Sequence, residues 1–244
     1  MQCWGLSDVG CVRKQNQDSY RIAELDRSTL LCVVCDGMGG AKSGNIASSL
    51  AVDVFVEEIR RCWIPRKMTT EKMDLALRGA VKLANFTVYD QARQFEEFDG
   101  MGTTLVAALV TPTMAILINV GDSRAYGIDG DGIRQLTRDH SLVQMMVDRG
   151  DLTPEQAKSY PGKNFITRAV GTETTVMSDL YHVDVKKGDY LLLCSDGLSN
   201  ILDDQEILFE VVHGVNKRRC CKRLLDIVKS RGAPDNVTSV LVEI

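Results

Sequence analysis

The stretch LLCVVCDG, residues 30–37, is a short apolar run that ends in an aspartate and a glycine. Three further runs share this design: MAILINVGD at residues 114–122, DYLLLCSDG at residues 189–197 and, with the acid in front, PDNVTSVLVEI at residues 234–244. Their Val, Ile and Leu content predicts largely buried strands. Each predicted strand carries an aspartate at one end, and these are Asp36, Asp122, Asp196 and Asp235.

These aspartates have two interpretations. Asp-Gly is a common turn signal, and the tetrad DGDG at residues 129–132 predicts only such a turn. A buried carboxylate, however, is costly unless it is paired or bound to a metal, so converging strand ends would need cations between their acids. The recurrence after strongly apolar runs favours the second interpretation. Oxygen ligands without a Cys or His set suit Mg²⁺ or Mn²⁺.

The composition is that of an ordinary globular protein. Of 244 residues, 44% are hydrophobic and 25% charged, and we expect one domain over residues 1–244. The formal net charge of -4 disfavours nucleic acid or an anionic membrane surface as a partner. No apolar stretch reaches the roughly 20 residues of a bilayer-spanning helix. Because the first ten residues also lack the features of a signal peptide, we expect a cytoplasmic protein.

The order of the predicted elements is irregular. Helices and strands are expected at the following places: strands at 1–10 and 20–35, helices after residue 43 and at about 70–95, a hairpin around 111–113, strands near 180–185 and 189–195, helices near 203–212 and 217–231, and a strand at 237–243. Residues 141–164 interrupt the β pattern with short helices and form a candidate mobile flap. Because strands and helices do not alternate, the pattern favours a layered α+β fold with antiparallel sheets. Cys32 and Cys35 would point to opposite faces of their strand, as core residues rather than a metal pair.

Two polar loops are candidates for chemistry. GMGGAKS at residues 37–43 lacks both glycines of the phosphate-loop pattern at the required spacing, so its glycines are interpreted as a sharp turn beside Asp36. In the loop before residue 20, Arg13 offers a planar fork for two phosphate oxygens, and Asp18 could join the acid cluster. A solvated polar loop explains these two residues equally well.

Seven stretches occur in one order: SDVGCVRKQNQD (7–18), VVCDGMGG (33–40), MGTT (101–104), VGDSRAY (120–126), TRDHS (137–141), CSDGL (194–198) and PDNVT (234–238). In these motifs the chain resembles the metal-dependent serine/threonine protein phosphatases of type 2C (the PPM family), most of all the compact bacterial members. The resemblance runs from about residue 6 to residue 242. It implies a four-layer αββα sandwich, with two antiparallel β-sheets flanked by helix pairs and a flap at about 141–164.

The resemblance also implies a binuclear metal centre. Asp36 would bridge two Mn²⁺ or Mg²⁺ ions, and the carbonyl of Gly37 would bind one of them. Asp196 and Asp235 would complete the centre.

Three further residues have implied roles around that centre. Asp18 would bind a metal directly or through water. Asp122, together with Asp196, would hold a weaker third ion. Arg13 would bind the substrate phosphate.

The implied reaction is hydrolysis of phosphoserine and phosphothreonine in proteins, by direct attack of a metal-bound hydroxide. A serine/threonine kinase would oppose it in signalling, and the protein is expected to be a monomer. Met38 and Ala41 stand where some relatives have a histidine, so a metal-bound water is the expected proton donor, and His140 is expected to be structural. Two alternatives stay open: a silent relative that binds phosphoproteins, and a phosphatase dedicated to one regulatory partner.

Overall fold

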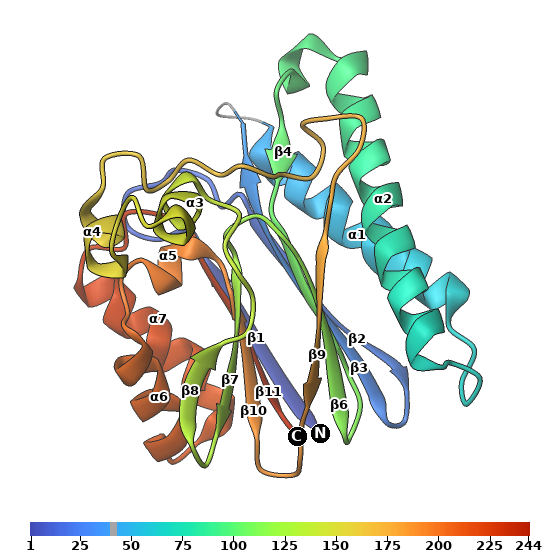
Figure 1. Ribbon diagram of the computed structural model, residues 1–244, viewed down its shortest axis with the longest axis vertical. Helices are drawn as coiled ribbons and strands as arrows, with labels where there is room; N and C mark the ends of the chain where they lie inside the picture. Colours follow the sequence, from blue (N-terminus) through green and yellow to red (C-terminus); the bar gives the residue numbers. More distant parts are fainter. Residues whose placement is uncertain (40–42) are drawn as a thin grey trace.

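The computed structural model describes residues 1–39 and 43–244, whose strands form two antiparallel sheets (Figure 1). The first sheet has the order β1-β11-β10-β7-β8, with β1 Gln2–Asp8, β7 Arg124–Asp129, β8 Gly132–Gln135, β10 Tyr190–Cys194 and β11 Val237–Glu243. The second has the order β2-β3-β5-β6-β9, with β2 Asp18–Asp26, β3 Thr29–Met38, β5 Leu105–Val110, β6 Met114–Val120 and β9 Asp179–Asp184, and β4 Gly102–Thr103 pairs with β3.

Helices cover the outer face of each sheet. The second sheet carries α1 Gly44–Cys62 and α2 Thr70–Gln94, and the first carries α6 Asp204–His213 and α7 Cys220–Ser230 (Figure 1). Three short helical elements accompany these outer helices, namely α5 Asp196–Ser199 and the 3-10 helices Glu96–Phe98 and Lys217–Arg219. The predicted four-layer αββα sandwich is therefore confirmed.

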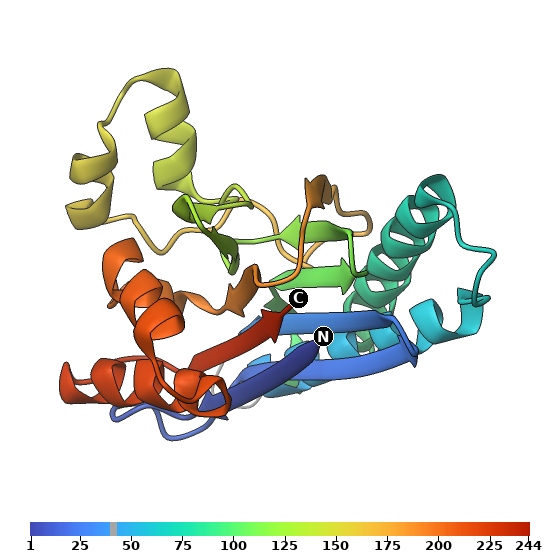
Figure 2. The ribbon, with the colours of Figure 1, turned by 90° about the horizontal axis from the view of Figure 1, so that it is seen from below.

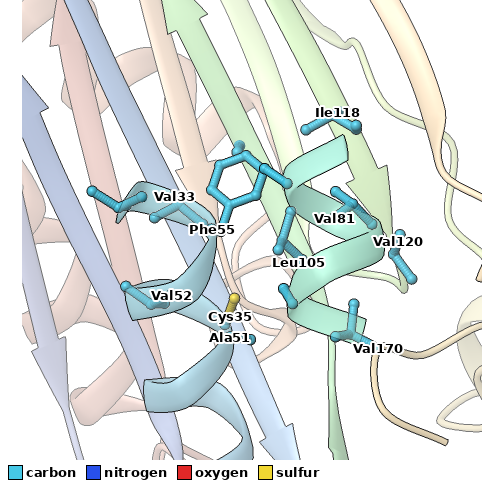
Figure 3. Close-up of a cluster of buried hydrophobic side chains, with 14 of the residues drawn as sticks. Val33, Cys35, Ala51, Val52, Phe55, Val81, Leu105, Ile118, Val120 and Val170 are labelled. Atoms are coloured by element: carbon cyan, nitrogen blue, oxygen red, sulfur yellow. The ribbon is translucent and has the colours of Figure 1, made fainter. Parts of the chain in front are cut away.

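The sandwich has three hydrophobic layers, and strand β3 contributes to two of them because side chains alternate along a strand. Val33 and Cys35 face the helices, with Val33 near Phe55 of α1 and Cys35 near Ala51 of the same helix (Figure 3). Cys32 and Val34 face the other sheet. The prediction that Cys32 and Cys35 are core residues on opposite faces is thus confirmed, and both side chains are fully buried.

Two details differ from the sequence prediction. The single strand expected at 20–35 is the hairpin β2–β3, whose turn is closed when Ser28 N donates to Asp26 Oδ1 at 2.9 Å. Asp36 does not follow its strand but lies inside β3, near the end of it. The predicted turn at 129–132 is confirmed, with Asp131 N donating to Asp129 Oδ1 at 2.9 Å.

The predicted insertion contains the expected helices, α3 Leu142–Arg149 and α4 Pro154–Ser159. Thr153 caps α4 in a capping box with Gln156, and Pro154 occupies its first turn, a position where a missing N–H costs nothing. Both helices stand away from the body of the sandwich (Figure 2). Mobility of this segment stays a prediction. Among the helices of residues 1–39 and 43–244, none combines the length and hydrophobicity that a bilayer span requires.

Candidate active site

Asp18 and Asp36 meet where β2 and β3 pair. They are direct cross-strand partners in the antiparallel ladder, a relation that places both side chains on one face of the sheet. Asp18 is buried and only 7% exposed. Its Oδ2 accepts a hydrogen bond of 2.7 Å from Ser195 Oγ, which comes from the other sheet. The two sheets are therefore joined at this acid pair.

Asp196 and Asp235 come from the first sheet. Asp196 begins α5 directly after β10, and Asp235 lies two residues before β11. Gly197 packs so closely that a Cβ placed on it would lie 1.9 Å from the carbonyl oxygen of Asn236. Only glycine allows this contact, which fixes the α5 turn against the start of β11.

Asn236 is a site residue that sequence reasoning missed. Its side chain donates to the carbonyl oxygens of Val9 and Gln15 at 2.9 and 3.0 Å, and its Oδ1 accepts from Gln17 N at 2.8 Å. These bonds hold the loop that carries Arg13 against the start of β11. The adjacent Asp235 in PDNVT was the available signal, because an amide beside a functional acid is well suited to satisfy loop backbone groups.

Arg13 lies at the exposed side of this cluster. Its guanidinium donates to Asp235 Oδ2 at 2.8 Å, and about half of the side chain is exposed. The hydrogen bond with Asp235 raises the pKa of Arg13, with smaller contributions from the negative charges of Asp36 and Asp196. The structure therefore brings Arg13 to the carboxylates, and its binding of a substrate phosphate stays a prediction.

Asp122 occupies the turn between β6 and β7. Gly121 before it has φ +102, a conformation that favours glycine. Burial, followed by the charges of Asp196 and Asp139, raises the pKa of Asp122 to about 7. The structure thus also brings Asp122 within electrostatic reach of Asp196.

Gly37 continues β3 after Asp36, and a Cβ placed on it would lie 2.0 Å from the carbonyl oxygen of Gly44. The absence of a side chain lets the start of α1 approach the strand. Met38 ends β3, whereas Ala41 and Lys42 lie outside the described residues.

The acids raise one another's pKa values. Burial, then the negative charges of Asp18, Asp196 and Asp122, holds the pKa of Asp36 well above its usual range. Asp36 also shares a side-chain hydrogen bond with Asp196, and burial, followed by the negative charge of Asp235, raises the pKa of Asp196 despite this bond. Burial raises the pKa of Asp18 to about 6. Without a cation, at least one of these carboxyl groups is therefore protonated at neutral pH and donates a hydrogen bond to another.

This environment fits divalent cations. Asp18 Oδ1 is buried and has no hydrogen-bond partner, which is costly for a carboxylate oxygen. All candidate donors are oxygens, the type that Mg²⁺ and Mn²⁺ prefer. Within the described ranges, no three His, Cys, Asp or Glu side chains already form a complete ligand set. Ion binding would therefore require the Asp36–Asp196 hydrogen bond to open and these side chains to turn toward the metal.

The histidines lie outside this acid cluster. His140 is buried, its Nδ1 accepts from Gly121 N at 3.1 Å, and its Nε2 lies 3.1 Å from Asp179 Oδ2. Burial lowers its pKa, so the ring is neutral at pH 7. His182 pairs with Asp74, and His213 stacks beside Phe209. His140 therefore supports the Asp122 turn, as its predicted structural role requires.

The arrangement of two packed antiparallel sheets with helices outside them is shared with solved phosphatases. The serine/threonine phosphatase Stp1 from Staphylococcus aureus is 36% identical, with a TM-score of 0.92 over 100% of this chain and 94% of that one. The catalytic domain of the phosphatase PstP, in complex with two manganese ions, is 32% identical, with a TM-score of 0.84 over 99% and 97%.

Sequence comparison gives the same result. The family model described as protein phosphatase 2C matches residues 12–227. The serine/threonine phosphatase stp from Listeria innocua is 34% identical over 97% of this chain and 93% of its own length. The chain belongs to the protein phosphatase 2C family, and it is accordingly a protein-serine/threonine phosphatase, a hydrolase.

Proposed function

We propose that this phosphatase works with two divalent cations, Mn²⁺ or Mg²⁺, held by Asp36, the Gly37 carbonyl, Asp196 and Asp235, with Asp18 in direct or water-mediated contact. Asp122 and Asp196 would hold a weaker third ion. The observation that carries this proposal is the buried, unpartnered Asp18 Oδ1 among acids whose pKa values are mutually raised. Such a group has a large affinity for positive charge. The two manganese ions of the PstP structure support the number and type of ion.

The cations would supply Lewis acidity and a water molecule of lowered pKa. The chain's own residues do the rest. Arg13, half-exposed and bound to Asp235 through one nitrogen, exchanges that contact for two phosphate oxygens of the substrate. To hold a cation, Asp36 would give up its proton to solvent water and release its hydrogen bond with Asp196. Since none of the histidines described in the structure lies in the acid cluster, the leaving alkoxide takes its proton from water rather than from imidazole.

The remaining elements of the proposal concern biology. Phosphorylated proteins are the substrates, a serine/threonine kinase opposes the enzyme in signalling, and the protein acts as a cytoplasmic monomer of bacterial type. Residues 1–244 form its single catalytic domain, with the flap at about 141–164. No observation favours a silent relative or a phosphatase dedicated to one regulatory partner.

The test begins with protein freed of metal by EDTA. Phosphate release from a phosphothreonine peptide should appear only after Mn²⁺ or Mg²⁺ is added. Asp36→Asn should abolish turnover while circular dichroism stays unchanged, and Asp129→Asn, in the turn between β7 and β8, is the matched control that should stay active. Metal-independent turnover, or full activity of Asp36→Asn, would sink the proposal.

A further inference from the structure

Thr104 lies between two candidate metal ligands, Asp36 in β3 and Asp122 in the turn after β6. It occupies the break between β4 and β5, opposite Asp36. Its Oγ1 accepts a hydrogen bond of 2.9 Å from Asp36 N, and its own backbone N donates to Asp36 O at 2.9 Å. Thr104 therefore fixes the peptide groups on both sides of the Asp36 side chain.

The same side chain contacts both neighbours of Asp122. Its Oγ1 forms a second hydrogen bond, of 2.7 Å, with Ser123 Oγ. Its methyl group fills the space beside Gly121, where a Cβ would lie 2.6 Å from Thr104 Cγ2. Thr104 thus touches the residue before and the residue after Asp122, through different atoms.

These contacts are buried and leave the hydroxyl little freedom. Thr104 is 2% exposed, and Ser123 is fully buried. A hydroxyl has one proton and two lone pairs, so Oγ1 can accept from Asp36 N and still bond Ser123 in either direction. Replacing it with a methyl group would leave the Asp36 N–H and the Ser123 hydroxyl without their partner in a dry environment. One hydroxyl therefore ties the backbone of Asp36 to the turn of Asp122.

We propose that Thr104 is a positioning residue that holds Asp36 and Asp122 in a fixed relation, so that one side chain shapes both the core centre and the weaker third site. This inference rests on the metal sites of the proposed function. Residues that orient metal ligands from outside typically change metal affinity by about 10- to 100-fold. Thr104 would act on both sites, whereas Ser123 would act on the third site alone.

The test is a Mn²⁺ titration of the full EDTA-treated chain, monitored by calorimetry and by the electron paramagnetic resonance signal of free Mn²⁺. The tight phase of the titration is binding to the core centre, and the weak phase is binding to the third site. Asp122→Asn identifies the weak phase by removing it. Thr104→Val, which keeps the shape and loses the hydroxyl, should weaken both phases by about 10-fold or more. Ser123→Ala should weaken only the weak phase. The double variant should match Thr104→Val, because both changes remove the same hydrogen bond.

Two control variants distinguish a positioning role of Thr104 from a general loss of stability. Thr104→Ser keeps the hydroxyl and should retain the tight phase. Thr111→Val removes a comparable hydroxyl at the other end of β5, where Thr111 Oγ1 accepts from Met114 N at 3.1 Å, and it should leave both phases unchanged.

Four outcomes decide the matter. Wild-type protein that binds no Mn²⁺ would overturn the proposed function itself and this inference with it. Wild-type binding together with unchanged phases in Thr104→Val, or additive effects of the two single variants, would overturn the inference alone. If Thr104→Val failed to fold, Ser123→Ala would decide, because an unchanged weak phase in that variant contradicts the link.

Discussion

Metal-free protein should lose stability as the pH rises from 5 to 8. The pKa of Asp18 is raised to about 6 and that of Asp122 to about 7, from an ordinary value of 3.8. Between pH 3.8 and these raised values, the two carboxyls therefore bind more protons in the folded state than in the unfolded state. The stabilisation that they contribute is complete below pH 3.8 and is lost as the pH rises through their folded pKa values. At 1.36 kcal/mol per pKa unit, the parts of these two shifts that fall between pH 5 and pH 8 correspond to roughly 1 and 3 kcal/mol. Because the acids interact, the two values do not simply add, and we expect a loss of about 3 kcal/mol or more.

The assay is urea unfolding in EDTA at pH 5 and pH 8, followed by the tryptophan fluorescence of Trp4 and Trp63. Adding Mn²⁺ should stabilise the protein far more at pH 8 than at pH 5, because protons compete for the same carboxylates. The lowered pKa of His140 acts in the opposite direction near pH 6.5, since its neutral form is favoured by folding.

The variant Asp18→Asn isolates the carboxylate contribution. It retains an acceptor for the hydroxyl of Ser195 but removes the charge. Metal-free Asp18→Asn should be more stable than wild type at pH 8 and have a shallower pH dependence. The reasoning is refuted if metal-free wild type is as stable at pH 8 as at pH 5, or if the variant has the same slope as wild type.

Three shorter predictions concern binding and packing. Arg13→Ala should raise KM by about 10-fold for a phosphothreonine peptide with a smaller change in kcat, since it removes one charge-assisted phosphate contact; an unchanged KM in steady-state kinetics would contradict its role. Asp122→Ala should shift the Mn²⁺ dependence of activity to higher concentration while two ions stay tightly bound by calorimetry; loss of both tight ions would show that Asp122 belongs to the core centre. Phe55→Ala should lower the free energy of unfolding by about 3–5 kcal/mol in urea, because the ring is fully buried between α1 and the sheet; a loss below 1 kcal/mol would mean that the layer collapses around the gap.

The parts that sequence predicted well depend on local pattern. The last strand was expected at 237–243 and is Val237–Glu243, because a short run rich in β-branched and apolar residues after a Pro-Asp-Asn turn is typical of a strand. The second helix was expected at about 70–95 and is Thr70–Gln94, since its apolar residues recur every three to four positions. Four of the candidate acids were likewise singled out because each stands beside such a run, namely Asp36, Asp122, Asp196 and Asp235.

The parts that sequence missed depend on contacts between distant residues. The β2–β3 turn has no glycine and is closed by the side chain of Asp26, so it resembled the interior of one longer strand. Asp18 was assigned to a polar loop, yet it begins a strand and is buried by Ser195, which is 177 positions away in the sequence. Thr104 offered no signal beyond its place in MGTT, because its partners come from strand β3 and from the distant turn between β6 and β7.

The pairing of the first strand with the last has a consequence for how the molecule is made. Strand β1 hydrogen-bonds only to β11 among the described strands, and the two chain ends lie side by side (Figures 1 and 2). During synthesis β1 stays unpaired until residues 237–243 have left the ribosome, and pairing over so long a separation is intrinsically slow. Asp235 emerges with the same segment. Under the proposed function, the nascent polypeptide would therefore be inactive until β11 docks, so that dephosphorylating activity and completion of the sandwich would appear together.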